Sequence, residues 1–442
     1  MKFNVNEISS SEKEVEVTLD FEEIKSDLES EVSKQVKKLN VPGFRKGKIP
    51  RTMIKKMYGD AFEYEASEKV ANSHFWKIAK DNSLNPIGQP VMTDLDFKVG
   101  EDLKFKVKFE TIPTLEVKDY TNLEIEVPDY KANDDEVEKE IFNIKKSNSK
   151  NEKSEEVSGA NFIIDVKMQR VNEDGTPYQD TKVEKMQIDL TNERVRPDII
   201  KNANGKKIGE TFQFSFDDKK KIAKPDGTEE EISEKVLYDI RIIDINKMVL
   251  PDLNEELVKK VTKDKVTNEA DLRTEIKKDI QNYYDQQMEQ ITRGKLINKI
   301  IENNEFTPPV TLVNNILDEM IKSEEQRLNQ QGIKKINREN LVTYLKPSAE
   351  HEVKWYLLKA ELEKKENIKV TDEELNEMAK KDSEKTGLPI EKLINYYKNS
   401  NQTERLTEQK LFDYLKMNNT IRRVDPEKFH NHEHGKEELH DK

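Results

Sequence analysis

The chain has 442 residues, which is room for two to four domains. Charged residues make up 37% and hydrophobic residues only 34%, with a net charge of −13, so we expect a multi-lobed molecule with much solvated surface. The absence of cysteine excludes disulfide scaffolds, thiolate metal sites, iron–sulfur clusters and cysteine nucleophiles. No apolar run approaches the ~18 residues that span a bilayer, and no signal-peptide pattern opens the chain, so we expect a cytoplasmic protein with no membrane partner.

Residues 1–112 are predicted to form an α/β domain. Apolar residues alternate over 2–8, 14–21 and 103–109, which predicts half-buried strands. Apolar residues three or four positions apart predict a helix over 21–39. A loop over 41–50 follows, and further helices are expected after Pro50 and over about 61–80.

The rest of the chain predicts a connector, a β module and a helical region. Residues 113–155 are charged and are expected to contain a helix and to pack with the C-terminal helices. Residues 156–247 alternate in a pattern typical of a small, mostly antiparallel β module. Residues 248–425 hold a helical period, and the His-rich stretch 426–442 is expected to be disordered. The predicted fold class is a multidomain α+β protein with an elongated all-α C-terminal domain.

One local charge pattern stands out against this acidic background. Between Val32 and Gly59 there are nine lysines and arginines and no acidic residue, so the remainder of the chain carries −22. The loop in this stretch has Pro42 and Pro50 to stiffen it, and Phe44 lies at its tip. An aromatic residue within a basic rim is typical of a docking site for an anionic partner. The alternative is a solvated surface with Phe44 folded into the core.

The loop itself carries a recognisable motif. Its residues are Gly43, Phe44, Arg45, Lys46, Gly47, Lys48, Ile49 and Pro50. They resemble the ribosome-binding signature (Gly-Phe-Arg-x-Gly-Lys-x-Pro) of the trigger factor family of bacterial ribosome-associated chaperones, whose domain order and length this chain also matches. The resemblance implies that Phe44, Arg45 and Lys46 dock on an exit-tunnel protein and nearby rRNA. Arginine and lysine neutralise phosphate or carboxylate, while an aromatic ring fills an apolar recess.

The resemblance also implies that residues 156–247 are similar to an FK506-binding-type prolyl isomerase. Such catalysis needs an apolar, aromatic-lined pocket that holds the X-Pro amide twisted. The matching pocket positions here are Asp165, Val166, Pro197 and Ile199, and the family has aromatic residues where Val166 and Ile199 stand. We therefore expect a module that is retained structurally and eroded catalytically, which serves as an extra arm or client surface; whether it is an enzyme stays open.

The function that we expect is an ATP-independent chaperone that binds nascent or unfolded polypeptides. Spare apolar residues in the helical region suit weak client binding or are ordinary core; among them are Tyr283, Tyr284, Tyr396 and Tyr397. The alternatives are a prolyl isomerase and a ribosome-assembly or RNA-binding factor. No cofactor or metal is expected, because there is no phosphate-binding loop and a sparse His-rich tail is more often merely disordered. A homodimer of the free protein is left open.

Overall fold

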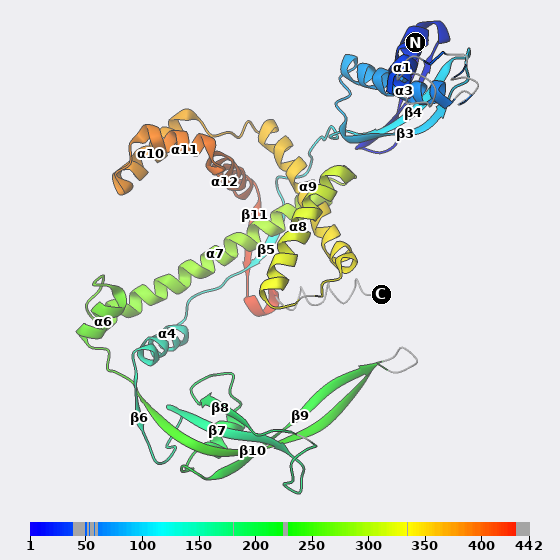
Figure 1. The fold of residues 1–442 in the computed structure, drawn as a ribbon. Helices are drawn as coiled ribbons and strands as arrows, with labels where there is room; N and C mark the ends of the chain where they lie inside the picture. Colours follow the sequence, from blue (N-terminus) through cyan, green and yellow to red (C-terminus); the bar gives the residue numbers. More distant parts are fainter. Residues whose placement is uncertain are drawn as a thin grey trace. The chain divides into compact units, whose positions relative to one another are not determined.

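The computed structural model describes residues 1–38, 49–50, 53, 57, 61–179, 181–223, 229–333 and 335–429. These residues form two compact units, one of residues 1–129 with 289–442 and the other of residues 130–288 (Figure 1). The α+β fold class is confirmed. None of the helices within the described ranges is long and apolar enough to cross a membrane.

The first unit begins with a four-stranded antiparallel sheet in the order β1-β2-β4-β3. The strands are β1 (Lys2–Glu7), β2 (Glu12–Leu19), β3 (Ile87–Asp96) and β4 (Leu103–Glu110). Residues Val15, Val17 and Leu19 of β2 point into the core, as their alternation predicts. The helices α1 (Phe21–Lys38) and α3 (Ala61–Asp81) contribute to the same apolar core.

The helical part of this unit contains the C-terminal half of α7 and five further helices. Their bounds are α7 (Glu269–Asn303), α8 (Val310–Gln330), α9 (Arg338–Lys365), α10 (Asp372–Thr386), α11 (Ile390–Asn399) and α12 (Gln402–Met417). Helix α10 begins with a capping box, in which Thr371 and Glu374 satisfy each other's backbone N–H groups. A parallel pair that the sequence did not predict joins β5 (Glu124–Pro128) to β11 (Thr420–Val424).

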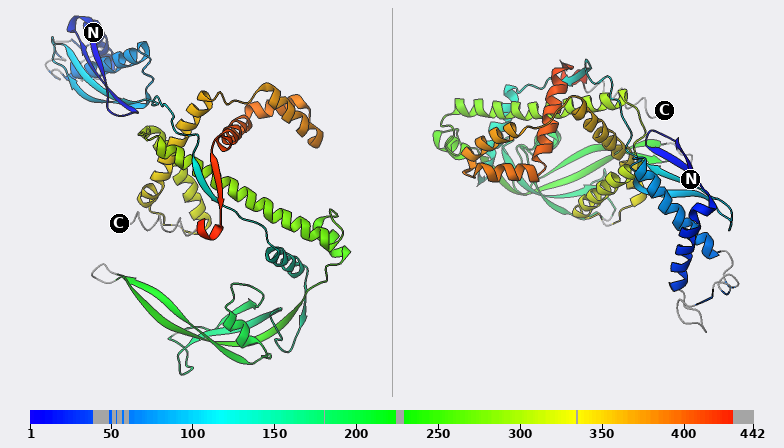
Figure 2. Two further views of the ribbon diagram at one scale, coloured as in Figure 1. Left: turned by 180° about the vertical axis from the view of Figure 1, so that it is seen from behind. Right: turned by 90° about the horizontal axis from the view of Figure 1, so that it is seen from above.

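The second unit contains a three-helix body and a β module. The body consists of α4 (Asp134–Ser147), α6 (Glu255–Thr262) and the first half of α7. The module is a five-stranded antiparallel sheet of β6 (Lys150–Lys153), β7 (Phe162–Val171), β8 (Glu184–Asp189), β9 (Thr211–Ala223) and β10 (Glu229–Val249), with the short helix α5 (Pro197–Ala203). The two longest strands, β9 and β10, pair as an extended hairpin (Figure 2).

Two local features differ from the sequence expectations, and a third expectation is described only in part. The end of the charged connector contains β6, because its backbone pairs with the end of β10. Just after it, Val157 is fully buried and exchanges backbone hydrogen bonds with Gly205 and Lys206. The helix expected after Pro50 lies mostly outside the described residues, although Met53 and Met57 are helical. Residues 426–429, expected within a disordered tail, form a helical turn because Phe429 is buried with Lys295 over its ring; residues 430–442 lie outside the described ranges.

Candidate functional site

The structure describes the base of the predicted docking loop but not its tip. Residues 43–48, which include Phe44, Arg45 and Lys46, lie outside the described residues. Ile49 and Pro50 lie inside them, and the backbone N–H of Met53 donates to the carbonyl of Pro50 over 3.0 Å. Two of the nine basic side chains are also described: Lys34 and Lys37 are exposed on the last turns of α1.

A small apolar cluster fixes this base. Ile49 packs on Val36 of α1, and Val32 and Phe62 flank the pair. Ile49 is 7% exposed and Val36 is 9% exposed, so the last residue of the basic loop before Pro50 is an anchor within its own domain. Ile49, which belongs to the eight-residue signature, therefore has a structural role.

The predicted isomerase-pocket positions are not all on one side of the sheet. Val166 of β7 is fully buried in the core of the module, and Ile199 of α5 packs against the same core. Asp165 is the neighbour of Val166 in β7 and so points to the opposite face, where its carboxylate accepts a hydrogen bond of 2.9 Å from the Gln187 amide. Pro197 is the first residue of α5 and is exposed.

Sequence reasoning missed an aromatic row beside α5, made of Phe214, Phe216 and Tyr238. The Phe214 and Phe216 rings stack with centroids 5.6 Å apart, and Phe216 stacks with Tyr238 at 6.4 Å and 10°. The register of β9 on β10, which sets Tyr238 opposite Phe214, brings the rings together. The Arg196 guanidinium lies 5.3 Å and 5.4 Å from the Phe214 and Phe216 centroids, a cation–π arrangement. The alternation of phenylalanines along β9 was the available signal.

The four candidate client-binding tyrosines divide into two kinds. Tyr283 and Tyr396 are exposed, at 58% and 59%. Tyr397 is buried and its hydroxyl donates to Asp382 over 2.7 Å. Tyr284 is half-buried, stacks on Tyr130 and donates to the Glu136 carboxylate, so its hydroxyl is committed within the fold.

Tyr283 and Tyr284 line an open groove of about 670 Å³ on the three-helix body. Its apolar wall includes Ile144, Val261 and Ile280. Side chains of both charges also border it, which suits a shallow, unselective surface. No group of three or more histidine, aspartate or glutamate side chains in the described ranges is arranged to hold a metal ion.

Comparison with known proteins settles the family. A model of the bacterial trigger factor protein matches residues 1–144, and a model of the trigger factor C-terminus matches residues 270–417. The chain belongs to the trigger factor family. Trigger factor is a ribosome-associated chaperone, so the chain's partners are the ribosome and nascent chains.

Individual relatives extend the match through the β module. The trigger factor of Chlorobaculum parvum is 26% identical over 398 residues, which cover 90% of this chain and 91% of the relative. The trigger factor of Syntrophotalea carbinolica is 28% identical over 407 residues, 90% of each. A solved structure comes from work on promiscuous substrate recognition in the folding and assembly activities of the trigger factor chaperone. It matches with a TM-score of 0.50 and 21% sequence identity, and the match covers 94% of this chain and 99% of that one. The two chains therefore share a fold.

Proposed function

We propose that this trigger factor docks at the exit of the ribosomal tunnel through Phe44, Arg45 and Lys46 and binds emerging polypeptides without ATP. The observation that carries the docking residues is the eight-residue signature in a stretch with nine basic residues and no acidic one. The buried Ile49 supports this assignment, because it ties one end of the loop to α1. The partner is an exit-tunnel protein together with adjacent rRNA.

The two kinds of side chain in the signature predict two contributions to binding. The arginine and lysine side chains neutralise rRNA phosphates or carboxylates and make binding salt-dependent. The Phe44 ring needs an apolar recess, which a folded ribosomal protein offers and a bare phosphate backbone does not. Docking on the ribosome therefore needs the Phe44 ring, whereas general RNA binding needs only the basic side chains.

A comparison of intact large ribosomal subunits with protein-free rRNA tests this assignment. The full chain is titrated against each at equal rRNA concentration, at low and at physiological salt. Tighter binding to intact subunits supports docking on a protein–RNA surface. Equal binding to protein-free rRNA supports the ribosome-assembly or RNA-binding alternative.

Client binding is assigned to the exposed aromatic side chains. Tyr283 and Tyr396 on the helices, and the partly buried Phe216 and Tyr238 of the β module, present apolar surface within a charged frame. Suppression of aggregation of an unfolded client, measured with the full chain and no nucleotide, tests the assignment. The Tyr283→Ser/Tyr396→Ser variant is expected to suppress aggregation less than wild type, whereas a wild-type yield would overturn it.

Prolyl isomerisation is the second candidate, and the aromatic row favours it because such a pocket needs aromatic walls. Against it stand Val166 and Ile199 at positions where the family has aromatic rings. A protease-free proline-isomerisation assay on the full chain compares wild type with Tyr238→Ala. Catalysis that is lost in the variant would support an enzyme, and rates equal to the uncatalysed reaction in both would support a client-binding surface alone.

We place the chain in the cytoplasm, where ribosomes translate. We also infer that the free protein forms a homodimer, because a basic patch on an otherwise acidic chain is complementary to its own remaining surface. Light scattering across a concentration series, at low and high salt, tests the dimer; a constant monomer mass would contradict it.

A further inference from the structure

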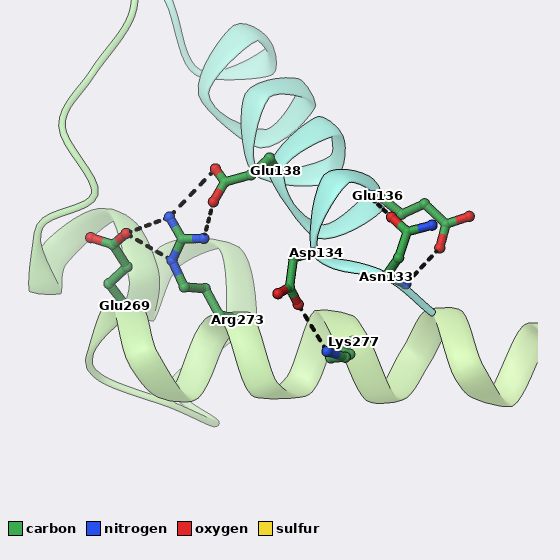
Figure 3. A network of polar contacts seen from close by, with 7 residues as sticks. All are labelled: Asn133, Asp134, Glu136, Glu138, Glu269, Arg273 and Lys277. Carbon is green, nitrogen blue, oxygen red and sulfur yellow. Dashed lines mark hydrogen bonds and ion pairs between the residues drawn. The ribbon is translucent and has the colours of Figure 1, made fainter. Parts of the chain in front are cut away.

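Helix α4 forms one body with α6 and the first half of α7. Its buried residues Val137 and Ile141 pack against an apolar cluster from the two other helices: Val258, Leu272 and Ile276. Ionic contacts flank this packing (Figure 3). Arg273 bridges Glu138 of α4 and Glu269 of its own helix, and Lys277 lies 2.8 Å from Asp134. Apolar burial and ion pairs together hold α4 in place.

The β module joins this body through two chain crossings. One runs from the end of α4 into β6, and the other runs from the end of β10 towards α6. The two crossings pair, with Lys150 opposite Val249 and Asn151 opposite Met248, just beyond the point where Lys247 of β10 also pairs with β7. A two-stranded neck followed by short irregular segments is a typical hinge, since a few residues can absorb a bend there.

A third link lies beside the neck. The Lys146 ammonium, in the last turn of α4, is 2.6 Å from a carboxylate oxygen of Asp189, at the end of β8. The other Asp189 oxygen accepts from the backbone N–H and hydroxyl of Thr191, over 3.0 Å and 2.6 Å. The hydrogen bonds from Thr191 thus fix the Asp189 carboxylate in an orientation that faces Lys146 of α4. Both side chains are 28% exposed.

Open grooves lie beside the Lys146–Asp189 ion pair. Grooves of about 550 Å³ and 630 Å³ adjoin it, and both are lined by Asn143 and Lys146. A second pair on the same side, Lys139 with Glu193 at 3.1 Å, is 66% and 79% exposed, so solvent and salt screen it strongly. The Lys146–Asp189 pair is the better-shielded of the two.

Asp189 also leads into the segment that carries two candidate pocket positions. Its carbonyl accepts from the N–H of Asn192 over 3.0 Å, and the carbonyl of Asn192 accepts from the N–H of Val195 over 2.9 Å. Helix α5, with Pro197 and Ile199, begins directly afterwards. The turn that holds the carboxylate is therefore continuous with the loop before α5.

We propose that the Lys146–Asp189 ion pair is a strut that sets the orientation of the β module on the α4–α6–α7 body. The neck supplies the pivot, and the strut, placed off the axis of the neck, restrains bending about it. Through the Asp189 turn, the same strut positions the loop before α5. Loss of either charge frees the module to swing while both parts stay folded.

A distance measurement in the full chain tests the strut. The chain has no cysteine, so Lys185→Cys on β8 and Lys278→Cys on α7, both exposed, take spin labels selectively. The labelled wild type is expected to give a narrow distance distribution. Lys146→Gln and Asp189→Asn are each expected to lose the narrow peak; the asparagine keeps an oxygen for Thr191. The double variant is expected to be no broader than either single variant, because the two changes remove one interaction.

Matched controls separate the strut from a general effect of charge. Lys139→Gln removes the exposed pair and is expected to leave the distribution narrow, as is Lys146→Arg, which keeps the positive charge. Circular dichroism confirms that each variant is folded. A broad distribution in the wild type, an unchanged one in Lys146→Gln, or equal broadening in Lys139→Gln would overturn the proposal.

Discussion

Ile49 packs directly on Val36, so the loop that carries the ribosome-binding signature is anchored to the helix that precedes it. The two side chains are almost fully buried, although charged residues dominate the surrounding sequence. A docking loop gains from such an anchor, because restricting the loop before binding lowers the entropy lost on docking. The signature therefore combines contact residues with a residue that holds them in place.

Truncating this anchor should weaken both the domain and its docking. Ile49→Ala removes a buried side chain and is expected to lower the free energy of unfolding by about 2–3 kcal/mol. Ribosome affinity should fall as well, because the loop loses its tether. Chemical denaturation and subunit binding measure the two effects. Ile112→Ala, at a 59% exposed position, is the control, and an equal loss there would contradict the account.

The adjacent tyrosines Tyr396 and Tyr397 should respond differently to the same substitution. Tyr397→Phe removes a buried hydroxyl that donates to Asp382 and is expected to destabilise the protein by about 1–2 kcal/mol. Tyr396→Phe, at an exposed ring, should be neutral. Thermal unfolding of both variants checks this, and equal melting temperatures would show that the hydrogen bond contributes nothing.

Tyrosines that are hydrogen-bonded to carboxylates should make stability fall at high pH. The bond to Glu366, with burial, raises the pKa of Tyr120 from 10.0 to about 12, and the bond to Glu136 does the same for Tyr284. Between pH 10 and 12 the folded state keeps phenolic protons that the unfolded state loses, so the free energy of unfolding decreases as pH rises through this window. Well below pH 10 both states keep these protons, so there the contribution of Tyr120 and Tyr284 to the free energy of unfolding is constant.

Tyr120→Phe isolates the contribution of Tyr120. Denaturation at a series of pH values should show a shallower decline for the variant than for the wild type. An ultraviolet titration of the folded protein should show tyrosines that resist ionisation until the chain unfolds. Identical slopes for variant and wild type would contradict the assignment.

Apolar packing should outweigh the ion pairs in holding α4 on α7. Ile141→Ala is expected to cost about 2–4 kcal/mol, since Ile141 is buried within the shared cluster. Arg273→Gln should cost no more than about 1 kcal/mol, because its partner Glu138 is largely exposed and screened. Urea denaturation of both variants compares them, and the reverse order would show that the network in Figure 3 dominates.

The sequence predicted the elements whose patterns are local. Helical spacing located α1, α4 and α7, and alternation located β2, β4 and the β module. Contacts between distant segments left no such pattern. The parallel pairing of β5 with β11 joins segments almost 300 residues apart. Residues 124–128 alternate over only five positions, and residues 420–424 do not alternate, so neither segment indicates its partner. The register that builds the aromatic row also depends on how β9 pairs with β10.

The candidate sites show the same division. The docking signature could be read directly, because its residues are contiguous. The anchoring role of Ile49 could not, because it requires Val36 on a neighbouring helix. Burial separated Tyr397 from Tyr396, although the two are adjacent in sequence. The Lys146–Asp189 pair joins two polar stretches that carry no motif in either segment.

Ribosome co-sedimentation of a triple variant tests docking through the signature most directly. Phe44→Ala/Arg45→Ala/Lys46→Ala is compared with wild type across a salt series. A matched control, Trp76→Ala/Lys77→Ala/Lys80→Ala, removes one exposed aromatic ring and two lysines from α3 of the same domain. We predict salt-sensitive binding for wild type and control, and loss of binding for the signature variant. Equal binding by all three proteins would contradict docking through Phe44, Arg45 and Lys46.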